Sequence, residues 1–306
     1  MATPLSAVRC TAWVAVAFVF LVPQTFGQTW STGNFNTNSG WVRGYSIIAS
    51  NQPVGLRWEG NDVYNPTTDL GETDNIMRMI GYTPGASGVG NSSWVQGGYF
   101  AADGIFPGTN NVKVWRSFTP ATGSPTGDAT FKTQWSLIGS LDGSFPQLDT
   151  FAFDLRTADN TVSLLRLDLT PGIATIPNGY TLQSVVDAGP AVNRIDLGYQ
   201  AVYELTVAIT GSLYDLSVAQ INPSDQSIIT NFFLVSGGAL TAGLGVDDFG
   251  TVSMDWALAS GDPADPGSNY IIVNDVSVVP EPSTYALLAL SVFALMAAGY
   301  RRRLRR

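Results

Sequence analysis

The side chains of this chain that could do chemistry are mostly carboxylates. The sequence of 306 residues has no histidine, and its one cysteine, Cys10, lies in an apolar N-terminal segment. Histidine-dependent triads and metal sites with histidine ligands are therefore excluded, and the body has neither a disulfide nor a thiolate nucleophile. Glycoside hydrolysis remains open, because two carboxylates suffice for it.

The glutamates that could serve a glycanase do not gather in the sequence. Between residues 28 and 278 they are Glu59, Glu72 and Glu204. None belongs to a Glu-x-Asp-x-x-Glu pattern, which would place catalytic acids on one strand, since Glu204 is followed by Thr206 and Ala208. A solvated strand face explains Glu204 better, so we expect no catalytic residue and no enzyme.

Two acidic loops are candidates for calcium. Asp247 and Asp248 are adjacent, and Asp262 and Asp265 lie in a Gly-Asp-Pro-Ala-Asp loop. Oxygen ligands suit Ca²⁺, but neither loop has the spacing of an EF-hand or of a calcium-binding nonapeptide repeat. Turns account for abundant aspartate without a metal. We therefore expect no cofactor, with calcium as the open alternative.

Tryptophans are candidates for stacking on sugar rings. Trp115, Trp135 and Trp256 fall in strand patterns and are expected in the core, whereas three others lie near glycines and are expected to be exposed. These three are Trp30, Trp41 and Trp94. The pattern assigns no individual residue to a carbohydrate-binding site.

Charge is unevenly distributed along the chain. Of the 15 basic residues one precedes residue 28 and five lie in the last six positions, and of the 24 acidic residues only Glu281 lies beyond residue 279. Residues 28–279 therefore keep 9 basic and 23 acidic side chains, a net charge of −14. Nucleic acid and anionic membrane surfaces would be repelled.

The N-terminal segment is typical of a secretory signal. Arg9 precedes the apolar run Thr11–Val22, and Thr25 and Gly27 supply small residues at the −3 and −1 positions of a cleavage site after Gly27. The run of twelve residues would span only about 18 Å as a helix, which is too short for a membrane core of about 30 Å. We expect residues 1–27 to be removed by signal peptidase.

The C-terminal segment has three parts in a fixed order. Pro280, Glu281 and Pro282 precede the uncharged run Tyr285–Tyr300, and the chain ends in an arginine cluster, which consists of Arg301, Arg302, Arg303, Arg305 and Arg306. The nineteen residues 282–300 would form about 28 Å of helix, enough to cross a bilayer. The arginines would remain cytoplasmic and the acidic body outside.

This arrangement resembles the PEP-CTERM family, whose members end in a Pro-Glu-Pro motif, a transmembrane helix and an arginine-rich tail. The resemblance covers residues 279–306. It implies that Pro280, Glu281 and Pro282 are a sorting motif, and that an exosortase removes the tail in Gram-negative bacteria that make exopolysaccharide. Two prolines would keep the motif extended at the membrane surface.

Between the two ends, short alternating segments separated by turn residues predict an all-β body. In 200–210, Tyr203, Leu205 and Val207 would face the core, as would Met254 and Trp256 near the C-terminus. Further buried positions would include Ile272. Strands are expected at 112–118, 130–138, 150–156, 161–168, 200–210, 213–219, 228–235, 252–258 and 270–278.

The first part of the body alternates less clearly. Short strands are expected at 42–49, 54–58, 75–82 and 93–100, with 74–81 alternatively forming one helical turn. No repeat and no low-complexity linker is visible, which favours one domain over residues 28–278. We expect an antiparallel two-sheet sandwich.

The order of strands after residue 110 resembles concanavalin-like jelly rolls. The segments 111–116, 131–138, 150–156 and 269–278 carry the resemblance, which implies a jelly-roll-like body and no particular ligand.

Taken together, the sequence predicts an exported bacterial protein of the cell surface or extracellular matrix. It would be anchored transiently in the inner membrane, processed by an exosortase and associated with extracellular polysaccharide. A calcium-dependent lectin-like module and a secreted glycanase are the alternatives.

Overall fold

The computed structural model describes most of the body of the protein. The described residues are 30–32, 35, 39–42, 47–60, 77–81, 98–103, 111–118, 128–138, 150–171, 179–187, 189–190, 192–199, 201–222, 225–257 and 270–280. The predicted signal peptide, Asp262 and Asp265, Trp94, and the sorting residues from Glu281 to Arg306 lie outside this part of the chain. No helix within these ranges is long and apolar enough to cross a membrane.

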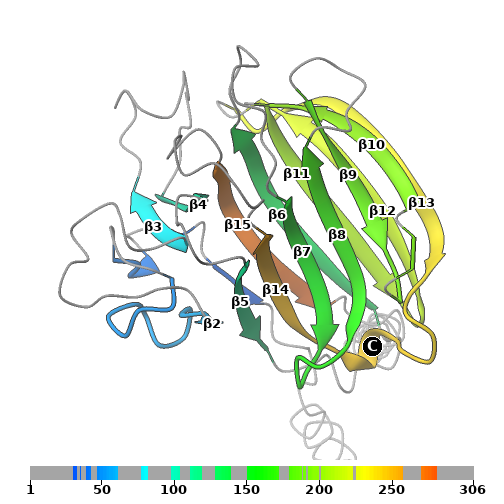
Figure 1. The fold of residues 1–306 in the computed structure, drawn as a ribbon, viewed down its shortest axis with the longest axis horizontal. Coiled ribbons are helices and arrows are strands. Elements are labelled where there is room, and N and C mark those ends of the chain that lie inside the picture. Colours follow the sequence, from blue (N-terminus) through cyan, green and yellow to red (C-terminus); the bar gives the residue numbers. More distant parts are fainter. Residues whose placement is uncertain are drawn as a thin grey trace, which may run out of the picture.

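Two antiparallel sheets make up the described structure (Figure 1). Sheet A has eight strands in the order β13-β12-β11-β6-β15-β4-β3, with β1 also paired to β15. Its strands are β1 (Trp30–Ser31), β3 (Met77–Gly81), β4 (Gly98–Asp103), β6 (Asp128–Ile138), β11 (Val202–Thr210), β12 (Leu213–Ile221), β13 (Ile228–Ala239) and β15 (Tyr270–Pro280).

Sheet B has seven strands in the order β10-β9-β8-β7-β14-β5-β2. They are β2 (Glu59–Gly60), β5 (Asn111–Ser117), β7 (Thr150–Thr157), β8 (Ser163–Pro171), β9 (Gly179–Val185), β10 (Val192–Gly198) and β14 (Phe249–Ala257). Strands that are distant in sequence lie side by side, as β14 between β5 and β7 shows. The fold is therefore built mainly from long-range pairings.

Period-two alternation places one face of each sheet in the core. On β11 the side chains of Tyr203, Leu205 and Val207 are buried, and on β14 those of Met254 and Trp256 are buried as well. Successive strand residues point to opposite faces, so this pattern predicts a half-buried strand. These buried positions, together with Ile272, confirm the sequence prediction.

Aromatic side chains join the two sheets across the core. The ring of Trp135 on β6 lies 5.9 Å from that of Phe153 on β7, measured between centroids. Trp135 Nε1 donates a hydrogen bond of 2.9 Å to the hydroxyl of Tyr180 on β9. The backbone N–H of Gly198 on β10 donates to the hydroxyl of Tyr203 on β11 at 2.9 Å. The described body is thus a two-sheet sandwich with apolar and hydrogen-bonded contacts between its layers.

The nine strands predicted after residue 110 are all present, some with longer ends. The strands β9 and β10 were not predicted. On β10 the side chains alternate poorly between buried and exposed, because Asn193 lies in a register shift and adopts a positive φ of 53°. A period-two pattern in the sequence does not predict a strand whose inward-facing side changes at such an irregularity.

The early part of the body departs from prediction in two places. A strand at 54–58 is wrong, because the carbonyl of Pro53 accepts the N–H groups of Leu56 and Arg57 and the chain turns. A strand over 42–49 is also wrong for its described residues, where the side chain of Gln52 bonds both backbone groups of Val42 instead of a neighbouring strand. The strand β3 confirms the extended alternative for 75–82, and β4 overlaps the expected strand at 93–100.

The burial of three tryptophans, Trp30, Trp41 and Trp115, differs from expectation. Trp41 is 2% exposed and donates from Nε1 to the carbonyl of Thr32, so it is a core residue and not an exposed one. Trp30 is half-buried. Trp135 and Trp256 are core residues as predicted, whereas Trp115 is half-buried and donates to Glu59, because its side chain points away from the core on β5.

Candidate functional site

The described candidates for calcium and for acid catalysis lie apart from one another. Asp247 and Asp248 belong to the short 3-10 helix η3 (Val246–Asp248), where Asp248 Oδ2 accepts the N–H of Gly245. Both are exposed, and the described ranges contain no group of three or more acidic, histidine or cysteine side chains able to hold a metal ion. Through its bond to Gly245, Asp248 caps this short helix, and Asp247 lies beside it in the same turn.

The glutamates are divided between the sheets. Glu204 on β11 of sheet A accepts a hydrogen bond from Gln134, and Glu59 on β2 of sheet B accepts one from Trp115. Glu72 lies outside the described residues. The fold does not bring Glu59 and Glu204 together as a catalytic pair.

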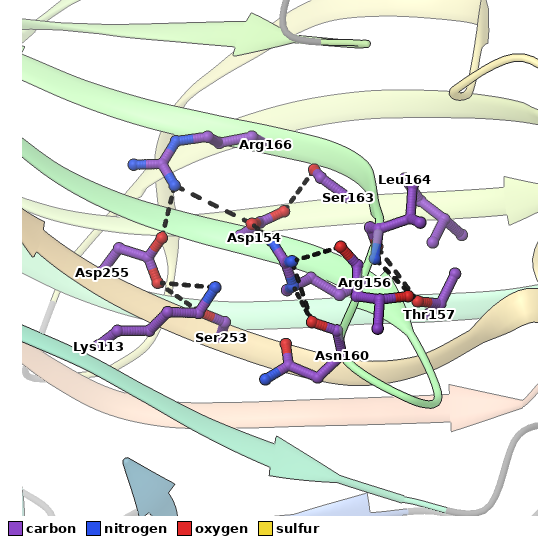
Figure 2. A network of polar contacts seen from close by, with 12 residues as sticks. Lys113, Asp154, Arg156, Thr157, Asn160, Ser163, Leu164, Arg166, Ser253 and Asp255 are labelled. Atoms are coloured by element: carbon purple, nitrogen blue, oxygen red, sulfur yellow. Dashed lines mark hydrogen bonds and ion pairs between the residues drawn. The ribbon is translucent and has the colours of Figure 1, made fainter. Parts of the chain in front are cut away.

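The structure instead gathers six charged side chains on the outer face of sheet B. We call this group the sheet B network; its members are Lys113, Asp154, Arg156, Arg166, Asp168 and Asp255. Figure 2 labels all of them except Asp168. They come from β5, β7, β8 and β14, which are neighbours in the sheet. The sequence signal was the polar residue between apolar ones, such as Asp154 between Phe153 and Leu155. It identifies the face but not the cross-strand partner.

Asp154 lies deepest in this network. Its side chain is 1% exposed, its Oδ1 accepts from Ser163 Oγ at 2.5 Å, and its Oδ2 accepts from Arg156 at 2.5 Å. Burial raises the pKa of Asp154, although the hydrogen bonds from Ser163 and Arg156 act in the opposite direction. Arg156 also donates to the carbonyls of Asn160 and Thr161 in the following turn, so it joins strand and turn.

Arg166 connects the other two carboxylates. Its Nε donates to Asp168 at 2.7 Å. Its terminal nitrogen donates to Asp255 at 2.5 Å and lies 4.0 Å from Asp154 (Figure 2). Lys113 Nζ is 3.9 Å from Asp255. Burial lowers the pKa of Lys113, and the charge of Asp255 opposes that change.

Each member of this network forms an ion pair with another member. It contains three cations and three carboxylates, and each carboxylate contacts a cation. A glycosidase needs one carboxyl group to hold a proton and a second to act as nucleophile or base. In the sheet B network each of the three carboxylates instead contacts a basic side chain on the same or a neighbouring strand. The arrangement suits pairing of strands better than acid catalysis.

A second polar arrangement lies where the body meets the sorting residues. The short strand β1 pairs with the end of β15, with Trp30 opposite Val278 and Ser31 opposite Ser277. Thr32 Oγ1 donates to Asp275 at 2.8 Å and accepts the N–H of Val276. The first described residues of the body are therefore hydrogen-bonded beside its last strand.

The last strand extends into the sorting motif. β15 ends at Pro280, two residues beyond the predicted end, and Pro280 lies opposite Ala129 of β6. A proline without an N–H donor is tolerated at a strand end. Glu281 and Pro282 follow at once, so no residue separates the end of the sheet from the rest of the motif.

Comparisons with known proteins identify this C-terminal segment. Residues 278–303 match the sequence profile of the PEP-CTERM protein-sorting motif. A search of curated proteins found no matching sequence. The profile covers Pro280, Glu281 and Pro282, the apolar run and the first arginines, and it overlaps β15 over residues 278–280.

Several solved structures are similar to the body at low identity. An endo-1,3-β-glucanase from Streptomyces sioyaensis is 12% identical with a TM-score of 0.43, over 84% of this chain and 96% of that chain. The calcium- and Man3GlcNAc-bound exoplasmic/lumenal domain of VIP36 is 10% identical with a TM-score of 0.41, over 78% and 90%. Lectin II from Ulex europaeus is 11% identical with a TM-score of 0.39, over 72% and 97%.

These scores lie below 0.5, so the assignment of a two-sheet sandwich rests on the strand order and core contacts described above. The motif indicates an exported protein that an exosortase targets and that its C-terminus anchors transiently in a membrane. The described body is thus all-β, and the chain carries a PEP-CTERM protein-sorting motif at residues 278–303.

Proposed function

We propose that this protein is a component of the bacterial cell surface or extracellular matrix, associated with exopolysaccharide. Signal peptidase would remove residues 1–27, and residues 285–300 would hold the body at the inner membrane until an exosortase removes the tail. The observation that carries the proposal is the sorting motif, which begins within the last strand of a folded body.

The proposal treats residues 28–278 as one domain without enzymatic activity. The described buried apolar residues form one cluster that includes side chains from both sheets, which supports a single domain. The ion pairing of Asp154, Asp168 and Asp255 supports a structural network on sheet B. A glycanase is the less favoured alternative for this reason, and a calcium-dependent lectin-like module remains the other alternative.

The net charge of the body bears on the polysaccharide. At −14 over residues 28–279, long-range repulsion disfavours direct binding to a polyanion. Neutral glycans, or acidic glycans bridged by calcium, are compatible with this charge. An association with exopolysaccharide is therefore proposed for uncharged chains first.

Fractionation of the native host tests this function. The wild-type protein is expected in the matrix fraction, and a variant with Pro280, Glu281 and Pro282 all replaced by alanine is expected in the membrane fraction. Deleting the exosortase should reproduce the result of the triple replacement. Release of the wild type from the matrix by a glycan-degrading enzyme supports the association, whereas an unchanged distribution in all strains contradicts the proposal. A reducing-sugar assay on the same fractions tests for glycanase activity.

A further inference from the structure

The outer face of sheet A differs chemically from that of sheet B. Register pairings place two rows of side chains side by side across its strands, on the side opposite the buried Tyr203, Leu205 and Val207. We call these rows the sheet A platform. One row is Asn231, Ala219, Glu204, Gln134 and Asp275, and the other is Phe233, Ser217, Thr206, Lys132 and Ser277. Amides, hydroxyls and small side chains dominate it.

At the centre of the platform, three amide side chains and one carboxylate are held in fixed positions. Gln134 Nε2 donates to Glu204 at 3.0 Å and to Gln226 at 3.1 Å, and Gln134 Oε1 accepts from Asn274 at 3.1 Å. These four residues, the amide cluster, come from β6, β11, β15 and the turn before β13. Because Gln134 bonds all three others, the cluster is preorganised without a charged pair.

A β-bulge supplies the most unusual member of the cluster. The register of β15 against β6 shifts between Val273 and Asp275, which leaves Asn274 as the extra residue. Asn274 is 6% exposed, and its Oδ1 is buried without a hydrogen-bond partner. A buried acceptor without a donor is destabilising, so it needs an explanation. Asn274 is held in this position by its own donation to Gln134 at the bulge.

Backbone strain lies at the same cluster. Gln226 has a positive φ of 60°, which is uncommon for a residue other than glycine. Its conformation is part of a turn in which its N–H donates to the carbonyl of Asn222. The turn brings the Gln226 side chain to Gln134, although β11 lies between β6 and β12 in the sheet. The Gln226 side chain therefore reaches across the face of the sheet.

An exposed aromatic ring lies on the other row. Phe233 is 66% exposed and stands opposite Ser217, which itself pairs with Thr206. Neighbouring strands are about 4.8 Å apart, so β13 and β11 are separated by about 10 Å. The ring of Phe233 and the carboxylate of Glu204 could thus contact different sugar units of one oligosaccharide, but not a single monosaccharide.

A second copy of the chain is a poorer occupant of this surface. β13 is an edge strand, and Ile228 and Ile229 are also largely exposed on it. However, its pairing with β12 has register shifts in three places. Such irregularities bend an edge strand and hinder regular addition of another strand.

We propose that the sheet A platform binds an uncharged oligosaccharide segment of at least three sugar units, with Phe233 stacked on a sugar ring and the amide cluster bonded to hydroxyls. Sugar hydroxyls both donate and accept, which matches the amide of Gln226 and the carboxylate of Glu204. The apolar face of a sugar ring matches an aromatic face. This inference rests on the proposed association with polysaccharide and names its site.

Binding by the full-length protein to an array of neutral hexose oligosaccharides of two to eight units tests the proposal. Matched uronic-acid oligosaccharides are printed beside them, and the array is run with calcium and with EDTA. Two variants address the site. Phe233→Ser removes the ring, and Gln226→Gly removes an amide at a position whose positive φ suits glycine.

Each variant has a matched control elsewhere on the surface. Val54→Ser changes an apolar side chain that is 80% exposed, and Asn193→Gly removes an amide at a positive φ of 53° on sheet B. Far-ultraviolet circular dichroism checks that all four variants fold. Phe233→Ser is expected to weaken binding to the bound neutral probe about tenfold, as loss of an aromatic contact does, and the controls are expected to bind as the wild type.

The outcomes separate the site from the function. Loss of binding in Phe233→Ser and in Gln226→Gly, with both controls unchanged, supports the platform. Wild-type binding to a neutral probe that neither variant weakens overturns the platform while the polysaccharide association stands. No binding of the wild type to any probe overturns both. Binding to uronic-acid probes that EDTA abolishes overturns the uncharged ligand in favour of a calcium bridge.

Discussion

Replacing Trp135 with phenylalanine should weaken the contact between the two sheets, and the resulting loss of stability should be larger than the lost side-chain volume alone would cause. Trp135 is fully buried, and its Nε1 donates to the hydroxyl of Tyr180, which is also fully buried. Phenylalanine keeps an aromatic ring in place but cannot donate. Tyr180 would then lose the donor to its hydroxyl oxygen in the middle of the core.

The magnitude follows from two contributions. A buried polar group left without its partner costs about 1–3 kcal/mol. The smaller ring leaves part of the site empty, which we take to cost about 1–2 kcal/mol more, within the range of large-to-small core substitutions. Trp58 is a matched control, because it is 1% exposed but its Nε1 is buried without a partner. Trp58→Phe loses a similar volume and removes an unpaired donor, so it should cost less.

Urea unfolding followed by tryptophan fluorescence and circular dichroism measures both changes. Trp135→Phe is expected to lower the free energy of unfolding by about 2 kcal/mol more than Trp58→Phe does. A double-mutant cycle with Tyr180→Phe should give a coupling energy near 1 kcal/mol. Equal losses in the two tryptophan variants, or a coupling near zero, would refute the inter-sheet hydrogen bond as a source of stability.

Three further predictions concern other parts of the body. Burial raises the pKa of Asp154 above its ordinary value of 3.8, so the folded state binds more protons than the unfolded state, and stability falls as pH rises from about 3.8 through the raised pKa. In urea unfolding, the stability of the wild type should therefore fall in that pH window relative to the stability of Asp154→Asn. A parallel pH dependence of the two proteins would contradict this. Gly60→Ala should destabilise the protein by about 2 kcal/mol or more, because the added Cβ would lie 2.4 Å from the carbonyl oxygen of Lys113. The control Gly55→Ala places its Cβ where nothing lies within 4 Å, so it should change stability by under about 0.5 kcal/mol. Similar melting temperatures for the two variants would be inconsistent with the close approach at Gly60. Thr32→Val should lower the free energy of unfolding in urea by about 1–3 kcal/mol, because the N–H of Val276 and the carboxylate of Asp275 lose their hydrogen bonds to the Thr32 hydroxyl. A loss under about 0.5 kcal/mol would show that β1 contributes little to stability.

The strands after residue 110 could be predicted because their alternation is regular and their ends are marked by turn residues. Tyr203, Leu205 and Val207 are buried as their spacing predicts. The early body could not be predicted equally well, because Gln52 and Pro53 bond the backbone through local contacts that a period-two pattern does not contain. Trp41 is buried for the same reason, since its partner is a backbone carbonyl nine residues away.

Site residues divide in a similar way. The sorting motif could be recognised because its residues are contiguous in sequence, from Pro280 to the arginine cluster. The sheet B network could not be assembled from the sequence, because Arg166 and Asp255 are 89 residues apart and meet only through the strand order β8-β7-β14. Asn274 enters the amide cluster through a β-bulge, and a shift of register has no mark in the alternation of side chains.

The central claim is that the C-terminal segment is a sorting signal that is removed from a folded surface protein. Intact-mass spectrometry of the protein from its native host, with and without the exosortase gene, tests this most directly. We expect a mature chain that begins near residue 28 and lacks residues 285–306 when the exosortase is present, and a chain that keeps these residues when it is absent. Retention of Tyr285–Arg306 on the mature surface protein in the wild-type host would contradict the account and leave an ordinary tail anchor.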